Sequence, residues 1–227
     1  MRPSWHRPGA APTPLASARV VASSRLDDVA RRIAAIDPAL GQVIDAHGPR
    51  RLPPRPRVGD RFETLAHSIT HQQLAGRAAA TIWSRVRATV PGDFTPEAVV
   101  AVAPEALAAA GLSGAKRAAL TDLAHHVLDG RVRLDRLGHA TDAEVVAELV
   151  QVRGIGPWTA EMFLMFTLRR PDVWPIGDLG VRTGWARAHG LDEAPDARRL
   201  AEAGEPFRPH RSLVAWYCWR SCEPPPL

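Results

Sequence analysis

Residues 149–162 read LVQVRGIGPWTAEM, and this segment predicts two helices joined by a tight turn. The first helix is expected to end at Arg153, and Gly154 and Gly156 permit the positive φ angles of such a turn. Pro157 suits the first turn of the second helix, where its missing N–H needs no partner. The N–H groups of the turn lack intrahelical partners, so they can converge on one phosphate oxygen of a nucleic acid backbone. Taken alone, a Gly-x-Gly turn is more typical of an ordinary corner between packed helices.

Outward from this turn, the sequence predicts an all-α fold. Apolar residues at helical spacing indicate a first helix from Leu26 that ends before Pro38. Further helices are expected at 60–72, 75–89, 96–102, 104–110, 114–129, 142–150, 179–189 and in a C-terminal segment from Arg211 to Trp219. Patterns typical of strands occur only in fragments such as 131–134, which are too short to form a sheet.

Two of these helices have distinct sequence signals. Between residues 115 and 128 an apolar stripe is formed by Leu120, Leu123, Ala124 and Val127. The polar residues of that segment, Lys116, Arg117 and Asp122, are expected to face away from the core. Thr141 followed by Glu144 has the spacing of a capping box, which indicates a helix start.

Asp178 lies in the segment 174–182, which reads WPIGDLGVR. It follows a loop rich in proline and glycine and precedes the predicted helix 179–189, so it stands where an N-cap is expected. Without further context, an N-cap is the simplest interpretation of this residue.

The string VRGIGPWTA, followed by a Gly/Pro-rich loop and Asp178, resembles the helix-hairpin-helix (HhH-GPD) DNA glycosylases. Within that superfamily it is most similar to the DNA-3-methyladenine glycosylase II group, over about residues 26–222. The resemblance implies two helical lobes with the active-site cleft between them. Lobe A is expected at about 26–58 plus 170–227, and lobe B at about 59–169. The N-terminal α/β domain of many bacterial members does not fit in residues 1–25, so we expect the compact form with a Pro/Arg-rich arm.

The resemblance implies that Asp178 is the catalytic carboxylate. Cleavage of an N-glycosidic bond builds positive charge on the sugar, and a carboxylate can stabilise that charge and orient the attacking water. Trp158 occupies the position at which bifunctional members carry a Schiff-base lysine. Because tryptophan cannot form an imine, we expect a monofunctional enzyme without lyase activity.

The resemblance also implies a base pocket walled by Trp158, Trp219, Met162 and Leu179. Aromatic faces favour a flipped, cationic alkylated purine, although core packing is the common role of any single tryptophan. Met162 departs from the family, where an aromatic residue is frequent at this position.

The expected DNA contacts are of two kinds. Gly154, Ile155, Gly156 and Thr159 of the hairpin would hold the backbone. The segment 68–76, SITHQQLAG, resembles the corner that inserts a side chain into the gap left by a flipped base, with Gln73 as the wedge beside Gln72 and Leu74. The alternative is that both glutamines are exposed helix-end residues. The segment 111–117 also resembles the family, and there it supports the fold and could touch phosphate.

No cofactor is expected, and two cysteines, Cys218 and Cys222, are too few for the four-cysteine iron–sulfur loop of some relatives. Both are expected to be reduced thiols. The resemblance alone implies a possible Na⁺ or K⁺ at the carbonyls of the Gly154/Gly156 hairpin. His71, His125 and His126 lack partners at ligand spacing, so they are interpreted as surface or capping residues rather than metal ligands.

Composition limits the class of protein. The 227 residues carry a formal net charge of +5 and a pI of about 10.4, which favours an acidic partner such as DNA or reflects a solvated basic N-terminal tail. No uninterrupted apolar stretch is long enough for a membrane span, so membrane insertion is not expected. Reduced thiols indicate a cytoplasmic protein, and we expect it to act as a monomer.

Three functions remain open from the sequence. The first is release of alkylated purines such as 3-methyladenine from duplex DNA, which leaves an abasic site. The second is a glycosylase for another lesion, such as a deaminated or etheno-type base. The third is a non-catalytic protein that binds DNA structures through the hairpin.

Overall fold

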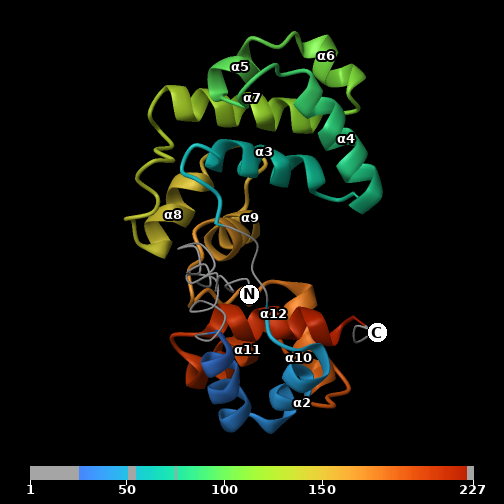
Figure 1. Cartoon of the computed structure of the whole chain (residues 1–227), viewed down its shortest axis with the longest axis vertical. Helices are drawn as coiled ribbons and strands as arrows, with labels where there is room; N and C mark the ends of the chain where they lie inside the picture. Colours follow the sequence, from blue (N-terminus) through green and yellow to red (C-terminus); the bar gives the residue numbers. More distant parts are fainter. Residues whose placement is uncertain (1–25, 51–54, 75, 224–227) are drawn as a thin grey trace, which may run out of the picture. The chain divides into compact units, whose positions relative to one another are not determined.

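The computed structural model describes residues 26–50, 55–74 and 76–223, and all regular structure in these ranges is helical (Figure 1). The described residues form two compact units, one from 26–50 with 179–223 and one from 55–178. From the sequence, the boundaries between the two lobes were expected after residues 58 and 169. With the observed division, Asp178 belongs to the same unit as the hairpin. The expected arm at 1–25 lies outside the described residues.

The hairpin unit contains the helices predicted from the sequence, with bounds within two residues of those expected. In chain order they are α3 (Arg61–His71), α4 (Gly76–Ala88), α5 (Pro96–Val100), α6 (Pro104–Ala109), α7 (Gly114–Leu128), α8 (Asp142–Leu149) and α9 (Pro157–Met162). A π-helical turn, η1 (Phe163–Thr167), continues α9 and was not expected. The capping box of Thr141 and Glu144 at the start of α8 is confirmed.

Helix α7 is the central element of this unit, because it packs against α3, α5 and α6. Leu120, Leu123 and Ala124 of the predicted stripe are buried, and Val127 is half-buried. The interpretation of His126 as a surface residue is wrong. Its ring is buried, with Nδ1 2.9 Å from the carbonyl oxygen of Asp122 and Nε2 2.9 Å from the guanidinium of Arg131. A histidine with both ring nitrogens partnered is tolerated in a core.

The other unit begins with helical residues 26–36. It continues with α2 (Pro38–His47), α10 (Leu179–Ala188), α11 (Ala197–Gly204), the short 3₁₀ turn η2 (Glu205–Phe207) and α12 (Arg211–Ser221). Helix α2 was missed, because Pro38 was taken as the end of the preceding helix. Pro38 is instead the first residue of α2, and the Asp37 side chain caps it by accepting from Ala39 N at 2.9 Å and Leu40 N at 3.2 Å.

The core of this unit depends on a close crossing of α10 and α12. Gly184 of α10 faces the backbone of α12, and a Cβ built there would lie 1.8 Å from the carbonyl oxygen of Cys218. Only a residue without a side chain allows this approach. The Ser221 hydroxyl donates to the Gly184 carbonyl at 2.8 Å, which fixes the crossing further.

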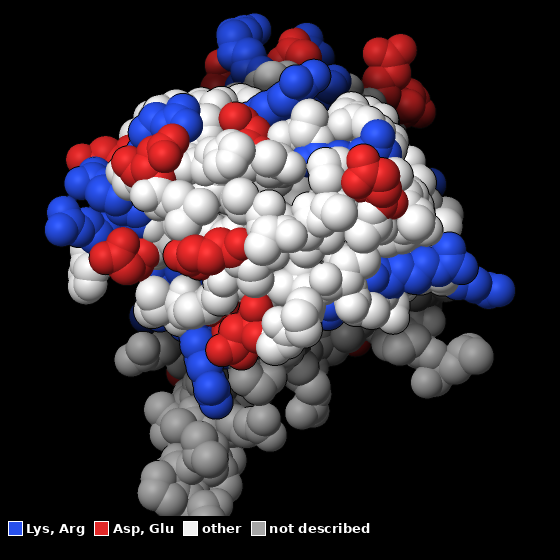
Figure 2. All heavy atoms as spheres, turned by 90° about the horizontal axis from the view of Figure 1, so that it is seen from above, with Lys and Arg blue, Asp and Glu red and all other residues white. Residues whose placement is uncertain are grey.

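Charge is not spread evenly over the hairpin unit. Figure 2 looks onto its end at α5 and α6, where most side chains are uncharged and the arginines and lysines lie toward the edges. No helix in the described ranges is long and apolar enough to span a bilayer.

Replacing Gly184 with alanine tests the crossing. The added methyl group must displace helix backbone, so Gly184→Ala is expected to destabilise the protein by about 3 kcal/mol or more. Gly76→Ala is the matched control, because no atom lies within 4 Å of a Cβ at that position. Urea denaturation followed by circular dichroism measures both. Equal stabilities of the two variants would show that the crossing is looser than described.

Candidate active site

One face of α7 holds the hairpin in place. A Cβ at Gly154 would lie 3.0 Å from the Cβ of Ala119, and the φ of +79° at Gly154 is also typical of glycine. The Asp122 carboxylate accepts from the Arg153 N–H at 2.7 Å. Asp122 was expected to face away, but it contributes a long-range contact that fixes the turn.

The two hairpin glycines differ in conformation. Both were expected to permit a positive φ; Gly154 adopts one, whereas Gly156 has a φ of −94° and is the N-cap residue of α9. The Ile155 side chain is buried and its N–H donates to the Val152 carbonyl at 3.0 Å. Thr159 is buried as well. The side chains of Ile155 and Thr159 therefore anchor the hairpin.

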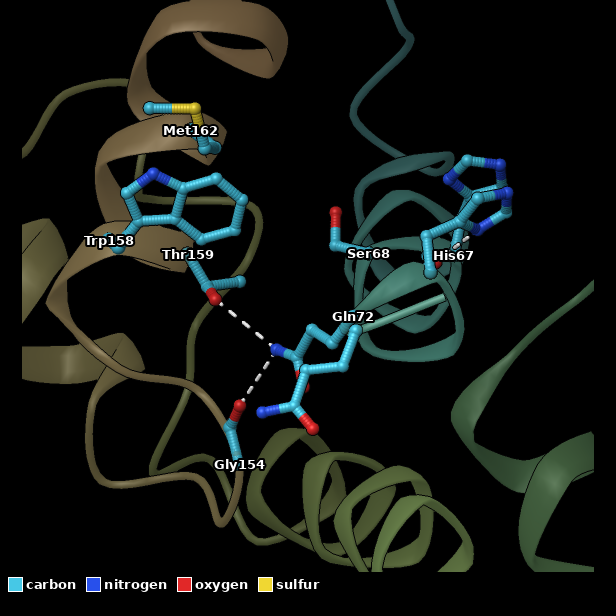
Figure 3. A pocket seen from close by; sticks show the side chains of 9 residues that line it. His67, Ser68, Gln72, Gly154, Trp158, Thr159 and Met162 are labelled. Carbon is cyan, nitrogen blue, oxygen red and sulfur yellow. Dashed lines mark hydrogen bonds between the residues drawn. The ribbon is translucent and has the colours of Figure 1, made fainter. Parts of the chain in front are cut away.

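The corner after α3 lies against the same hairpin. Lys116 of α7 donates from Nζ to the carbonyls of Thr70 and Gln72, at 2.7 Å each, so it also does not face away. The Gln72 amide nitrogen donates to the Gly154 carbonyl at 2.9 Å and to the Thr159 hydroxyl at 3.2 Å (Figure 3). Gln73 and Leu74, which follow, are exposed.

A cavity of about 500 Å³ opens between α3 and the hairpin helix α9. Figure 3 shows Trp158 and Met162 on the α9 side and Ser68 on the α3 side. Of the lining residues, only His67 lies outside the corner segment 68–76 and the hairpin segment 149–162. The cavity is lined by His67, Ser68, His71, Gln72, Gln73, Gly154, Trp158, Thr159 and Met162.

The two histidines of the lining are stacked on each other, with ring centroids 3.8 Å apart. His71 Nδ1 lies 2.9 Å from the His67 carbonyl oxygen, as suits a helical i, i+4 pair. Burial, and then the proximity of His71, lower the pKa of His67 below its ordinary value. The lowered pKa favours the uncharged form of His67 at neutral pH.

Asp178 forms a hydrogen bond with a side chain of the hairpin helix α9. The Trp158 indole donates from Nε1 to Asp178 Oδ2 at 2.5 Å. Asp178 is buried, with 8% of its surface exposed, whereas Trp158 is 49% exposed. The Asp178 N–H donates to the Pro175 carbonyl at 2.9 Å, so the turn before it is closed. The indole edge thus holds the carboxylate.

Glu161 is a second carboxyl group near this site, which the sequence analysis missed. It lies one helical turn after Trp158 on α9. Burial, and then the negative charge of Asp178, raise the pKa of Glu161 above its ordinary value. No hydrogen bond or opposite charge among the described residues offsets these two effects. The i, i+3 spacing from Trp158 was a usable signal, but the proximity of Asp178 was not visible in the sequence.

Comparison with known proteins identifies this arrangement. A family model described as "HhH-GPD superfamily base excision DNA repair protein" matches residues 66–209, which include the corner, the hairpin and Asp178. The chain belongs to the HhH-GPD superfamily. DNA-3-methyladenine glycosylase 1 of Schizosaccharomyces pombe is 32% identical to it over 163 residues, which cover 70% of this chain and 72% of that relative.

Solved structures agree with this assignment and with the all-α fold. DNA-3-methyladenine glycosidase from Bacillus halodurans has a TM-score of 0.73 and 36% identity, covering 83% of this HhH-GPD chain and 86% of that one. The S. pombe 3-methyladenine DNA glycosylase in complex with abasic DNA has a TM-score of 0.76 and 29% identity, covering 85% and 95%.

Two expected pocket residues of this HhH-GPD protein belong to the other unit. Leu179 is the first residue of α10 and is 68% exposed, and Trp219 lies half-buried in α12. Both cysteines are free thiols. The described residues contain no group of three or more histidine, cysteine or acidic side chains that could hold a metal ion.

The possible Na⁺ or K⁺ at the carbonyls of the Gly154/Gly156 hairpin stays a prediction. The Gly154 carbonyl already accepts from Gln72, and the Gly156 carbonyl accepts from Ala160 N at 3.1 Å. Each of these carbonyl oxygens keeps a second lone pair, so both can still act as ligands. We assign no step of the reaction to a cation.

The melting temperature of a Glu161→Gln variant at two pH values tests whether the pKa of Glu161 is raised. Because the folded-state pKa of Glu161 is raised, the folded state binds its proton more tightly, and this group costs stability once pH exceeds the unfolded value of about 4.3. The variant should therefore melt at a higher temperature than the natural protein at pH 8 and at the same temperature at pH 4. Thermal unfolding of the exposed control Glu193→Gln should show no such difference. A Glu161→Gln variant that is less stable at pH 8 would contradict the raised pKa.

Proposed function

We propose that this protein is a monofunctional DNA glycosylase that hydrolyses the N-glycosidic bond of alkylated purines, such as 3-methyladenine, in duplex DNA. The observation that carries the proposal is the contact between Trp158 Nε1 and Asp178 Oδ2 beside the cavity. It joins a buried carboxylate to a half-exposed aromatic ring, which are the two groups that release of a flipped base requires. The 3-methyladenine glycosylases among its relatives support the substrate class.

Asp178 is assigned the chemical step. As the bond between the sugar and the base breaks, its electron pair leaves with the base and positive charge grows on the deoxyribose. The carboxylate stabilises this charge, orients a water molecule toward the anomeric carbon and takes a proton from it. The indole N–H of Trp158 donates to Oδ2 and so fixes the position of the carboxylate.

The cavity is assigned the flipped base. The exposed face of Trp158 offers an electron-rich surface to a cationic purine, and Met162 adds polarizable apolar contact. An uncharged His67 at the wall avoids repulsion of that cation. Leu179 and Trp219 are proposed as further walls on the resemblance alone.

Further parts of the proposal concern strand cleavage, DNA contacts, cofactors and oligomeric state. Trp158 in place of a lysine supports hydrolysis without strand cleavage, because no amine is available at this position to form a Schiff base. The N–H groups of Gly154 and Gly156 are proposed to hold the DNA backbone, while Ile155, whose N–H donates to Val152, supports the turn between them. Gln73 and Leu74 are proposed to enter the duplex. We propose that the protein needs no cofactor and acts as a cytoplasmic monomer, to which the free thiols are suited.

Asp178→Asn tests the proposal, because the amide oxygen can still accept from Trp158 while the negative charge is lost. Release of 3-methyladenine from alkylated duplex DNA should fall by about 10²- to 10⁴-fold. Affinity for abasic-site DNA, measured by fluorescence anisotropy, should be retained. Borohydride should trap no covalent adduct with either protein.

The outcomes separate the competing functions. Undiminished release by Asp178→Asn would remove Asp178 as the catalyst. Release of only deaminated or etheno-type bases would assign a different lesion. Tight binding of abasic-site DNA without release of any base would indicate a non-catalytic protein that binds DNA structures.

A further inference from the structure

Gln72 was expected to touch DNA, but its amide is used inside the protein. The amide nitrogen carries two hydrogens, and it has two acceptors: the Gly154 carbonyl at 2.9 Å and the Thr159 hydroxyl at 3.2 Å. Both acceptors belong to the hairpin and its helix, and Thr159 is buried (Figure 3). Both amide hydrogens of this side chain therefore bond to the hairpin and its helix.

The main chain of Gln72 is held as well. Lys116 Nζ donates to its carbonyl at 2.7 Å and to the carbonyl of Thr70 at the same distance. Such charge-assisted bonds at the C-terminal end of a helix are among the stronger hydrogen bonds in proteins. Gln72 is thus fixed to α7 through its backbone and to the hairpin through its side chain.

Gln73, the next residue, has an unusual backbone conformation, which the fixed position of Gln72 would explain. Its φ is +55°, which is uncommon for a residue other than glycine. Its side chain is exposed at the cavity. A strained backbone persists only where the surrounding contacts determine it. Here a turn from Leu74 N to the His71 carbonyl, at 3.4 Å, spans Gln73, and the contacts of Gln72 hold the residue directly before it.

We propose that Gln72 is a clasp that sets the position of Gln73 relative to the hairpin. The gap in a base stack and the phosphates beside it stand at set positions on a duplex, so a wedge and a backbone grip must be held at a matching separation. Gln72 supplies this separation without touching DNA. The inference rests on the proposed function, since it assumes that Gln73 enters the duplex.

A double-mutant cycle tests the clasp. Gln72→Met keeps the length of the side chain and removes both hydrogen bonds to the hairpin. In the otherwise natural protein it should weaken binding of abasic-site DNA and slow release of 3-methyladenine by about 5- to 10-fold. In a Gln73→Ala background, where the wedge is gone, the same change should alter both quantities by less than about 2-fold.

Two results of this cycle would overturn the clasp. An effect of Gln72→Met that is undiminished in the Gln73→Ala background would overturn the clasp, because a direct DNA contact or a general loss of structure acts without the wedge. No effect in either background would overturn it as well.

A second variant approaches the clasp from the hairpin side. Thr159→Val removes one of the two acceptors at nearly constant volume, and its effect should likewise shrink in the Gln73→Ala background. This keeps the test valid if thermal melting shows that Gln72→Met does not fold. Binding of abasic-site DNA needs no catalysis, so a protein that releases no base but shows the expected coupling would contradict the proposed function and retain the clasp.

Discussion

The hydrogen bond from Trp158 Nε1 to Asp178 Oδ2 is the interaction on which the candidate site depends. A buried carboxylate is costly unless a donor satisfies it, and the indole N–H is such a donor. The bond uses only the edge of the ring, so the face of a half-exposed tryptophan remains free. One side chain therefore both positions the charged group and offers a flat surface to a base. A lysine at this position would give a different chemistry.

Helix α7 supplies the rigidity around this pair. Lys116, Ala119 and Asp122 follow one another at about one helical turn, and they contact the end of α3, Gly154 and Arg153 in that order. A single helix face thus holds both the corner and the hairpin. Sites carried on packed helices keep their geometry better than sites on free loops, because each contact is set by the core behind it.

Local signals made much of this predictable. Glycines, prolines and caps fix helix ends within a few residues, so the helices of the hairpin unit and the Thr141 capping box were found. Contacts between residues that are distant in the sequence were not predictable. The partners of Gln72 lie 82 and 87 residues away, and its polar side chain resembled a free surface group. His126 was misjudged although its partners, Asp122 and Arg131, are close in sequence. Helix α2 was missed although Asp37 and Pro38 are a good start signal.

The central claim is that the carboxylate held by Trp158 belongs to a site that releases alkylated bases. Mass spectrometry of bases freed from alkylated genomic DNA tests this most directly, because it presents many lesions at once. The expected result is free 3-methyladenine, with intact strands at the resulting abasic sites. Recovery of no free base above the level without protein, from DNA that the protein binds, would contradict the claim.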